Sequence, residues 1–333
     1  MNLYFPPFIY SFFLFSGTLI SVSSSSLFGM WMGLEINLMS FIPMIINMES
    51  NKKSSEAAIK YFLVQAVASA IIIFSALYFY MFSGYTFSKT PNILITLALG
   101  MKLGMAPFHF WFPEVLEGLN WINSLILLTW QKISPLVILS VFFYAEIIIT
   151  LALISAIMGA MSGINQTSMR KILAFSSISH LGWLTSMMYF NSSLWMDYFI
   201  IYCFTSLILC LSFWLLNLNY FSQLTLSQNL NEKFIIFINL LSLGGLPPLL
   251  GFLPKWLAMM VVSSNFPILI ILIISSLITL YFYTRLCFST FTLYMQSMMW
   301  HQKNKGSNKN FYLLSILTLF SMIGIIPLSL MNL

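Results

Sequence analysis

Four ionisable side chains stand inside long apolar runs of this chain, where a charge is costly. They are Glu35, Lys102, Lys132 and Lys255. A charge at the centre of a lipid bilayer costs about 2.5–3.5 kcal/mol on lenient insertion scales, so four facing lipid would cost about 10 kcal/mol. We therefore expect these side chains to face the interior of a helix bundle, to pair with one another or to contact water.

Buried lysines of this kind could carry protons. Burial disfavours the protonated form of a lysine, whereas a nearby carboxylate favours it. A lysine that alternates between these two settings takes up and releases a proton, a role we assign to Lys102 with Glu35 as its modulator. Lys132 and Lys255 would continue this proton path laterally through the protein, with waters bridging the gaps. The competing interpretation is a set of static salt bridges that hold helices together.

Three further residues are weaker candidates. His180 lies mid-span among hydroxyl residues that could hold water, and a hydrogen-bonded core histidine fits the same pattern equally well. For His109, between aromatic residues, we favour a packing role. Glu114 lies near the end of an apolar run, where an interfacial anchor is the simpler interpretation.

The composition determines the class of protein that must position these residues. Of 333 residues, 59% are hydrophobic and 7% are charged, against about 25% charged in soluble domains. This excludes a soluble enzyme, a nucleic-acid binder and a disordered chain, and predicts an all-α integral membrane protein. The three cysteines form no CxxC pair, no histidine pair has haem-like spacing, and no Gly-rich loop follows a strand. We therefore expect no metal, cofactor or nucleotide bound by this chain.

About eleven transmembrane helices fit the apolar runs, since each span needs about 20 apolar residues. Basic residues concentrate in the loops on the N-terminal side, and the opposite loops carry only Lys89. The positive-inside rule then places the N-terminus in the cytoplasm or mitochondrial matrix and the C-terminus opposite. The predicted spans are 3–22, 27–47, 57–82, 92–117, 120–144, 146–164, 168–190, 194–217, 233–262, 266–296 and 311–331.

Two of these spans, the fourth and the ninth, carry the same interruption. Each fits Gly-x-x-Pro-x5-Pro followed by a charged residue, from Gly104 and from Gly245, an offset of 141 residues. Each is the fourth span of a five-span block, and an odd block length makes the copies inverted. The predicted organisation is a first repeat (1–145), a second inverted repeat (146–296), and a loop with the last helix (297–333).

The prolines in these interruptions leave backbone carbonyls without their helical hydrogen bonds. Pro107 frees the carbonyl of Leu103, and Pro248 frees that of Gly244. Such carbonyls are tolerated at membrane depth only where protein or water meets them, and paired broken helices point to a transport path. Two independent proline kinks that only shape packing remain the alternative.

The same segments resemble the antiporter-like membrane subunits of respiratory complex I, most closely the insect form of the mitochondrial subunit 2 family. The resemblance is spread over most of the chain, while the final span matches only in hydropathy. The matching runs are Trp31–Leu38, Ala106–Pro113, Thr129–Lys132, Asn165–Lys171, Leu243–Pro248 and Pro254–Trp256.

The resemblance implies eleven helices, a matrix N-terminus and an inner-membrane location in the mitochondrion. It also implies that Glu35 is the essential glutamate, Lys102 the broken-helix lysine, Lys132 the central lysine and Lys255 the terminal channel lysine. Shifting Lys102 by 141 residues lands on Leu243. The two halves are therefore not chemically equivalent, and which half connects to which side stays open.

Our first hypothesis is a proton-conducting subunit of NADH:ubiquinone oxidoreductase, without a redox centre of its own. NADH, FMN, iron–sulfur clusters and ubiquinone would belong to the whole complex. The partners would be other membrane-arm and accessory subunits and structural lipids. The alternatives are a cation/proton antiporter subunit without redox coupling, and a purely structural subunit with static buried charges.

Overall fold

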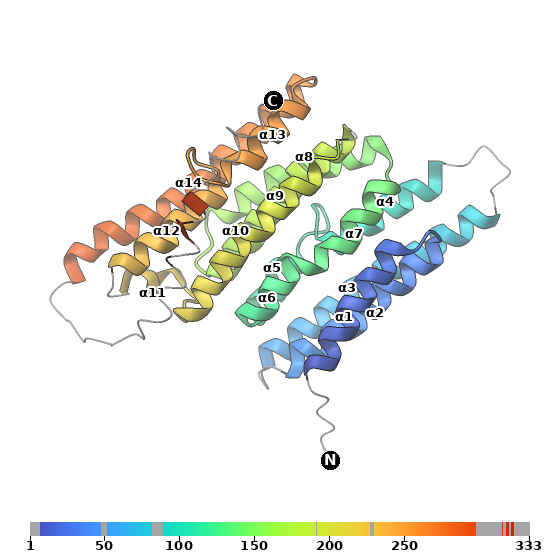
Figure 1. Cartoon of the computed structure of the whole chain (residues 1–333), viewed down its shortest axis with the longest axis horizontal. Coiled ribbons are helices and arrows are strands. Elements are labelled where there is room, and N and C mark those ends of the chain that lie inside the picture. Colours follow the sequence, from blue (N-terminus) through green and yellow to red (C-terminus); the bar gives the residue numbers. More distant parts are fainter. Residues whose placement is uncertain are drawn as a thin grey trace, which may run out of the picture. The chain divides into compact units, whose positions relative to one another are not determined.

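The computed structural model describes residues 7–47, 52–81, 89–190, 192–226 and 230–297, together with 315, 318, 319, 321 and 322. Apart from one isolated bridge between Ser168 and Tyr220, these residues form helices and the turns that join them (Figure 1). The chain divides into two compact units, Met1–Ser155 and Ala156–Leu333. Each unit is described by itself.

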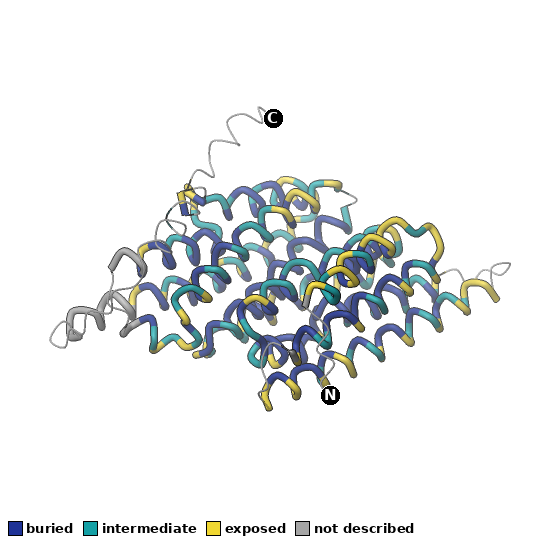
Figure 2. Tube along the Cα trace, turned by 60° about the horizontal axis from the view of Figure 1, so that its bottom comes forward, coloured by how far each residue is buried: buried dark blue, intermediate teal, exposed yellow. Residues whose placement is uncertain are grey.

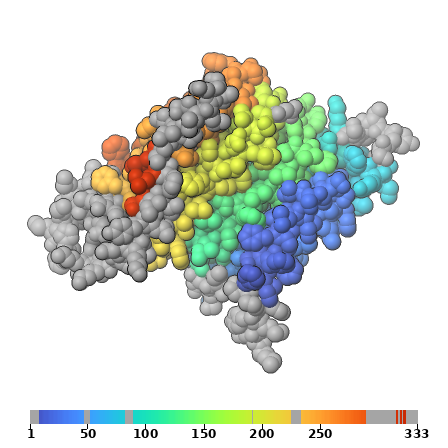
Figure 3. All heavy atoms as spheres, in the orientation of Figure 1, coloured from blue at the N-terminus to red at the C-terminus, as the bar shows by residue number. Residues whose placement is uncertain are grey.

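Unit 1 is a bundle in which helices α2, α3, α4 and α7 surround a common core. Helix α3 packs on α2, α4 and α5, and α7 packs on α1, α2, α4 and α6. The blue side chains of α1 accordingly lie beside the green ones of α7 in Figure 3. The helices are α1 (Pro7–Ser23), α2 (Leu27–Asn47), α3 (Lys52–Met81), α4 (Lys89–Leu103), α5 (Trp111–Gly118), α6 (Trp121–Leu128) and α7 (Trp130–Val141), and α8 (Ala145–Gly163) contains the boundary.

Helices α1 and α2 approach closely because glycine lines their crossing. A Cβ atom added at Gly33 would lie 2.7 Å from the carbonyl oxygen of Gly17. Small residues allow such backbone contact between membrane helices. This crossing fixes α2, which carries Glu35 and Asn37, in unit 1.

Unit 2 is built around α9, in which 18 of 21 residues are buried. Helices α10, α13 and α14 pack on α9, and α12 packs on α10, α13 and α14. The bounds are α9 (Met169–Tyr189), α10 (Trp195–Leu215), α11 (Phe221–Leu226), α12 (Leu230–Gly244), α13 (Phe252–Val262) and α14 (Phe266–Ser297).

The last described residues also belong to unit 2. The Ser321 hydroxyl donates to Asn239 Oδ1 at 2.9 Å. The backbone carbonyl of Ser321 accepts from the Leu250 N–H at 3.0 Å. Most of the predicted span 311–331 lies outside the described residues.

Six described helices or helix pairs are long and apolar enough to cross a membrane, so the chain is a multi-pass membrane protein. Exposed residues, yellow in Figure 2, include many large apolar side chains, as lipid-facing helices require. The predicted fourth and ninth spans each comprise two helices, α4 with α5 and α12 with α13. The six spans are Leu27–Ile46, Lys52–Met81, Trp121–Val141, Ala145–Gly163, Trp195–Leu215 and Phe266–Phe288.

Candidate functional site

The first interruption is a helix end of defined geometry. Gly104 adopts a φ of 75°, its N–H donates to the Met101 carbonyl at 3.1 Å, and the Met105 N–H donates to the Gly100 carbonyl at 2.9 Å. This is the Schellman arrangement, in which a left-handed residue, here glycine, ends the helix. Lys102 therefore lies in the last turn of α4, where the negative end of the helix dipole favours a cation.

Side chains from two other helices meet the carbonyls at this end. Gln65 on α3 donates its Nε2 to the Lys102 carbonyl at 3.2 Å. Trp111, the first residue of α5, donates its Nε1 to the Met101 carbonyl, also at 3.2 Å. The end of α4 is thus satisfied by protein groups inside the bundle, as buried backbone requires.

The second interruption repeats these hydrogen bonds residue for residue at the offset of 141. Gly245 has a φ of 81°, and its N–H donates to the Ser242 carbonyl at 2.9 Å. The Leu246 N–H donates to the Leu241 carbonyl at 3.2 Å. Here the side chain that meets the helix end is itself a lysine, because Lys255 donates its Nζ to the Gly244 carbonyl at 2.7 Å.

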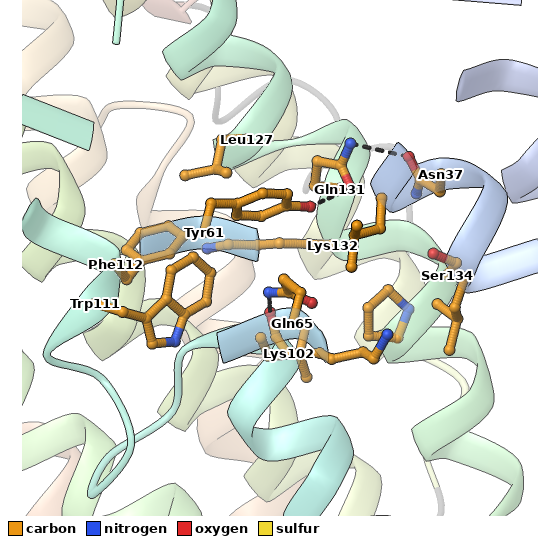
Figure 4. A pocket seen from close by; sticks show the side chains of 14 residues that line it. Asn37, Tyr61, Gln65, Lys102, Trp111, Phe112, Leu127, Gln131, Lys132 and Ser134 are labelled. Carbon is orange, nitrogen blue, oxygen red and sulfur yellow. Dashed lines mark hydrogen bonds between the residues drawn. The ribbon is translucent and has the colours of Figure 1, made fainter. Parts of the chain in front are cut away.

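In unit 1, Lys102 and Lys132 line one polar pocket between α2, α3, α4 and α7 (Figure 4). Both lysines are buried, with exposed fractions of 6% and 2%. The cavity volume is about 20 Å³, which is room for about one water molecule. The polar side chains around the two lysines are Asn37, Tyr61, Gln65, Gln131 and Ser134.

A hydrogen-bond chain crosses this pocket. The Tyr61 hydroxyl donates to Gln131 Oε1 at 3.4 Å, and Gln131 Nε2 donates to Asn37 Oδ1 at 2.9 Å. These three residues come from α3, α7 and α2. This hydrogen-bond chain therefore connects three helices through polar groups that can reorient and can accept or donate a hydrogen bond.

Glu35 lies on α2 two residues before Asn37 and is half-buried. Residues two apart on a helix point in different directions, so Asn37 lines the pocket and Glu35 does not. No ion pair within 4.0 Å joins Glu35 and Lys102, both of which the structure describes. Glu35 still interacts electrostatically with Lys102 and Tyr61 across a longer distance.

Lys132 contacts an aromatic ring. Its Nζ lies 5.2 Å from the centroid of the Phe112 ring, within the range of a cation–π interaction. Phe112 belongs to α5, just after the first interruption, so the helix that follows the interruption supplies an aromatic partner to Lys132.

In unit 2, His180 is 7% exposed and lies in the middle of α9. Its Nδ1 shares a hydrogen bond of 2.8 Å with the Tyr198 hydroxyl on α10, and its ring centroid lies 5.1 Å from that of Tyr202. Helix α9 also packs on α13, which carries Lys255. His180 is therefore hydrogen-bonded in the core of the unit that contains Lys255.

His109 and Glu114 differ in their surroundings. His109 is buried, and its ring lies 4.4 Å from the Phe110 ring. Glu114 is exposed, and its carboxylate forms an ion pair with Lys60 Nζ at 2.8 Å. Lys60 Nζ also pairs with Glu56, at 2.9 Å. Neither residue lines the pocket around Lys102.

Tyr61 and Gln65, which contact Gln131 and the Lys102 carbonyl, were not among the site residues predicted from the sequence. Their spacing of four residues was an available signal, because it puts two polar groups on one face of α3 within its long apolar part. Lys233, the first residue of the predicted span 233–262, is fully buried at the start of the apolar part of α12. Among the described residues there is no group of three or more His, Cys, Asp or Glu that could hold a metal ion.

Comparison with known proteins defines the class. Residues 24–280 match the family of NADH:quinone oxidoreductase and Mrp antiporter transmembrane proteins. The NADH-ubiquinone oxidoreductase chain 2 of Anopheles gambiae is 45% identical over 328 residues, which cover 96% of each chain. That of Mus musculus is 42% identical and covers 92% of this chain and 94% of the mouse protein. The chain belongs to this transmembrane family and, within it, to the NADH-ubiquinone oxidoreductase chain 2 proteins.

Two solved structures share the fold. A chain of respiratory complex I from Thermus thermophilus with bound aureothin has a TM-score of 0.83 at 22% identity, covering 96% of this chain and 78% of that one. A chain of the Mrp complex from Dietzia sp. DQ12-45-1b has a TM-score of 0.73 at 16% identity, covering 87% and 60%. The antiporter-like fold is therefore common to the redox-linked complex and to an Mrp complex.

Proposed function

We propose that this chain is a core membrane subunit of proton-pumping NADH:ubiquinone oxidoreductase and conducts protons through buried lysines. The observation that carries the proposal is the polar pocket of unit 1, where Lys102 and Lys132 line one cavity in the interior of an apolar bundle. Electrons pass from NADH to ubiquinone in other subunits, and this chain supplies a proton path without a redox centre.

Lys102 is the residue that we assign to proton uptake and release. Its burial disfavours the ammonium form, whereas the carboxyl end of α4 and the charge of Glu35 favour it. Opposing effects of this kind let a modest movement change the protonation state. Glu35 acts as the modulator through the electric field, because no direct ion pair holds the two side chains together.

Lys132 and the chain from Tyr61 through Gln131 to Asn37 are next to Lys102 in the same pocket. One water there would bridge polar groups that do not touch directly. Lys255 and His180 extend the proposed path within unit 2. Lys255 also lies at a helix carboxyl end, and His180 has the ring chemistry of a proton relay.

The proposed topology is eleven spans with two inverted five-helix repeats, residues 1–145 and 146–296, followed by 297–333. The matching Schellman ends of α4 and α12 support the repeat. The proposed location is the mitochondrial inner membrane, with the N-terminus in the matrix and the C-terminus in the intermembrane space. Other membrane-arm subunits and lipids are the proposed partners, while NADH, FMN, iron–sulfur clusters and ubiquinone bind elsewhere in the complex.

The test is Lys102→Ala in the assembled complex, with proton uptake per NADH oxidised measured in sealed membrane vesicles. We expect assembly with reduced proton uptake, because a methyl group cannot accept the proton. Lys89→Ala is the matched control, since Lys89 is the exposed first residue of the same helix.

An unchanged proton stoichiometry in Lys102→Ala would reject the proton-path role. The cation/proton antiporter alternative has the support of the shared family model and of a fold likeness at 16% identity. Purification of the chain without any NADH-oxidising subunit, together with sodium-driven proton transport, would favour that alternative.

A further inference from the structure

A second cavity lies in unit 2, away from the lysines. It has a volume of about 150 Å³ and opens between the loop that follows α8 and helices α9, α11 and α14. Its apolar wall includes Ile172, Phe221, Phe282 and Leu286, and Arg285 lines it as well. Asn165, Gln166 and Thr167 line it from the loop. A cavity of this size accepts a group as large as benzene, so a few methylene groups fit beside the apolar wall.

Arg285 lies at the depth of lipid head groups. Helix α14 has 32 residues, about 48 Å of helix, and its apolar span is Phe266–Phe288. Arg285 follows Phe266 by 19 residues, which is about 28 Å and close to the thickness of the hydrocarbon layer. Its guanidinium therefore reaches the membrane surface that lies opposite the start of α14.

The same arginine belongs to the outward-facing stripe of α14. This stripe follows the i, i+4, i+7 spacing of one helix face, and its other members are large and apolar. Within the span Phe266–Phe288, only 28% of an 18-residue apolar window is buried inside the chain. The exposed apolar members are Ile270, Ile274, Leu277, Tyr281 and Phe288.

The loop beside the cavity is held in place by its own hydrogen bonds. The Phe221 N–H donates to the Thr167 carbonyl at 3.0 Å, and the Met169 N–H donates to the Asn219 carbonyl at 3.0 Å. Arg285 Nη1 donates to the Ile164 carbonyl at 3.1 Å, which fixes the guanidinium at the cavity wall. The cavity is therefore a preformed feature of unit 2.

We propose that this cavity binds an anionic phospholipid, with its phosphate at Arg285 and the first methylenes of one acyl chain against Phe282 and Leu286. A planar guanidinium matches phosphate geometry, and basic pockets between membrane helices bind anionic head groups. Arg170 and Lys171, in the first turn of α9, add positive charge to the same region. The depth of Arg285 and the apolar wall select a lipid over free phosphate.

The test uses the whole complex in nanodiscs that contain phosphatidylglycerol with a diazirine near the glycerol end of one acyl chain. After illumination, mass spectrometry of peptides should find the label around Phe282–Leu286. Arg285→Gln should lower this labelling at least threefold. Leu286→Trp should also lower it, because the larger ring fills the cavity while the arginine remains.

Lys171→Gln is the matched control, since it removes a neighbouring charge that does not line the cavity, and it should lower the labelling by less than Arg285→Gln does. Excess inorganic phosphate should leave the labelling unchanged. Equal labelling in Arg285→Gln, abolition by free phosphate, or no label in the unaltered complex would each overturn the proposal. In the last case, another polypeptide covers the cavity. The labelling is measured independently of proton pumping. A failure of the lipid proposal is therefore distinguishable from a failure of the proposed function.

Discussion

Lys255 donates its ammonium to the carbonyl oxygen of Gly244 at 2.7 Å, so the lysine after the second interruption caps the helix that ends before it. The first interruption uses Gln65 and Trp111 for the same task and has its lysine, Lys102, inside the last turn of the helix. The two interruptions share the same backbone hydrogen bonds. They differ in the position of the lysine, which is in the last turn before the first interruption and in the helix after the second.

Gly245→Ala tests the second interruption. A non-glycine residue in the left-handed conformation costs about 1–2 kcal/mol, and the added Cβ would lie 2.8 Å from Lys255 Cδ. We expect Lys255 to be displaced, with a loss of thermal stability and of proton uptake per NADH. Gly244→Ala is the comparison variant, because Gly244 lacks the left-handed conformation and its Cβ would lie 3.3 Å from the Tyr283 ring rather than against Lys255. Equal behaviour of the two variants would contradict this account.

Gln65→Leu tests the first interruption. It removes the donor to the Lys102 carbonyl and leaves a buried acceptor unpaired, a cost of about 1–3 kcal/mol. We expect an assembled complex with faster hydrogen exchange around Gly104 and lower proton uptake. Ser69→Ala, one turn further along α3, removes a hydroxyl that bonds only within its own helix and should change little. Unaltered exchange in Gln65→Leu would refute the capping role.

The substitution Tyr198→Phe tests whether His180 takes part in proton transfer. The change removes the hydroxyl bonded to His180 Nδ1 and nothing else from the packing. A hydrogen bond worth about 1 kcal/mol changes an equilibrium about fivefold, so we expect a measurable shift in the pH profile of proton uptake. Tyr281→Phe, at an exposed position, is the control. An unshifted profile would assign His180 to packing alone.

A double exchange, Glu35→Lys with Lys102→Glu, separates conduction from static support. A purely structural role for the two charges predicts recovery of function, because the product of the charges is unchanged. The proton path predicts loss of proton uptake, because a carboxylate would replace the lysine at the negative end of the α4 dipole. Assembly on native gels, measured beside proton uptake, distinguishes loss of transport from loss of folding.

The sequence predicted the helical class and the positions of the interruptions for physical reasons. Long apolar runs with so few charges have no other stable form in a bilayer, and Gly-x-x-Pro marks a helix end through backbone chemistry. The structure ends α4 at Leu103 and α12 at Gly244, at those motifs.

The contacts of the site were harder to predict. Polar residues inside a membrane bundle show which positions avoid lipid but not which neighbours they meet. Gln65 contacts the end of α4, 37 positions away, and Gln131 contacts Asn37, 94 positions away. Glu35 and Lys102 were predicted to act together, yet the helical spacing turns Asn37 rather than Glu35 into the pocket.

The small volume beside Lys102 and Lys132 has a consequence for ion selectivity. The pocket has a volume of about 20 Å³, which is room for about one water molecule. A sodium ion with its shell of several waters exceeds that space many times over. A proton needs no such room, because it advances by exchange of hydrogen bonds. In the described conformation the pocket beside Lys102 and Lys132 is therefore too small for a hydrated cation.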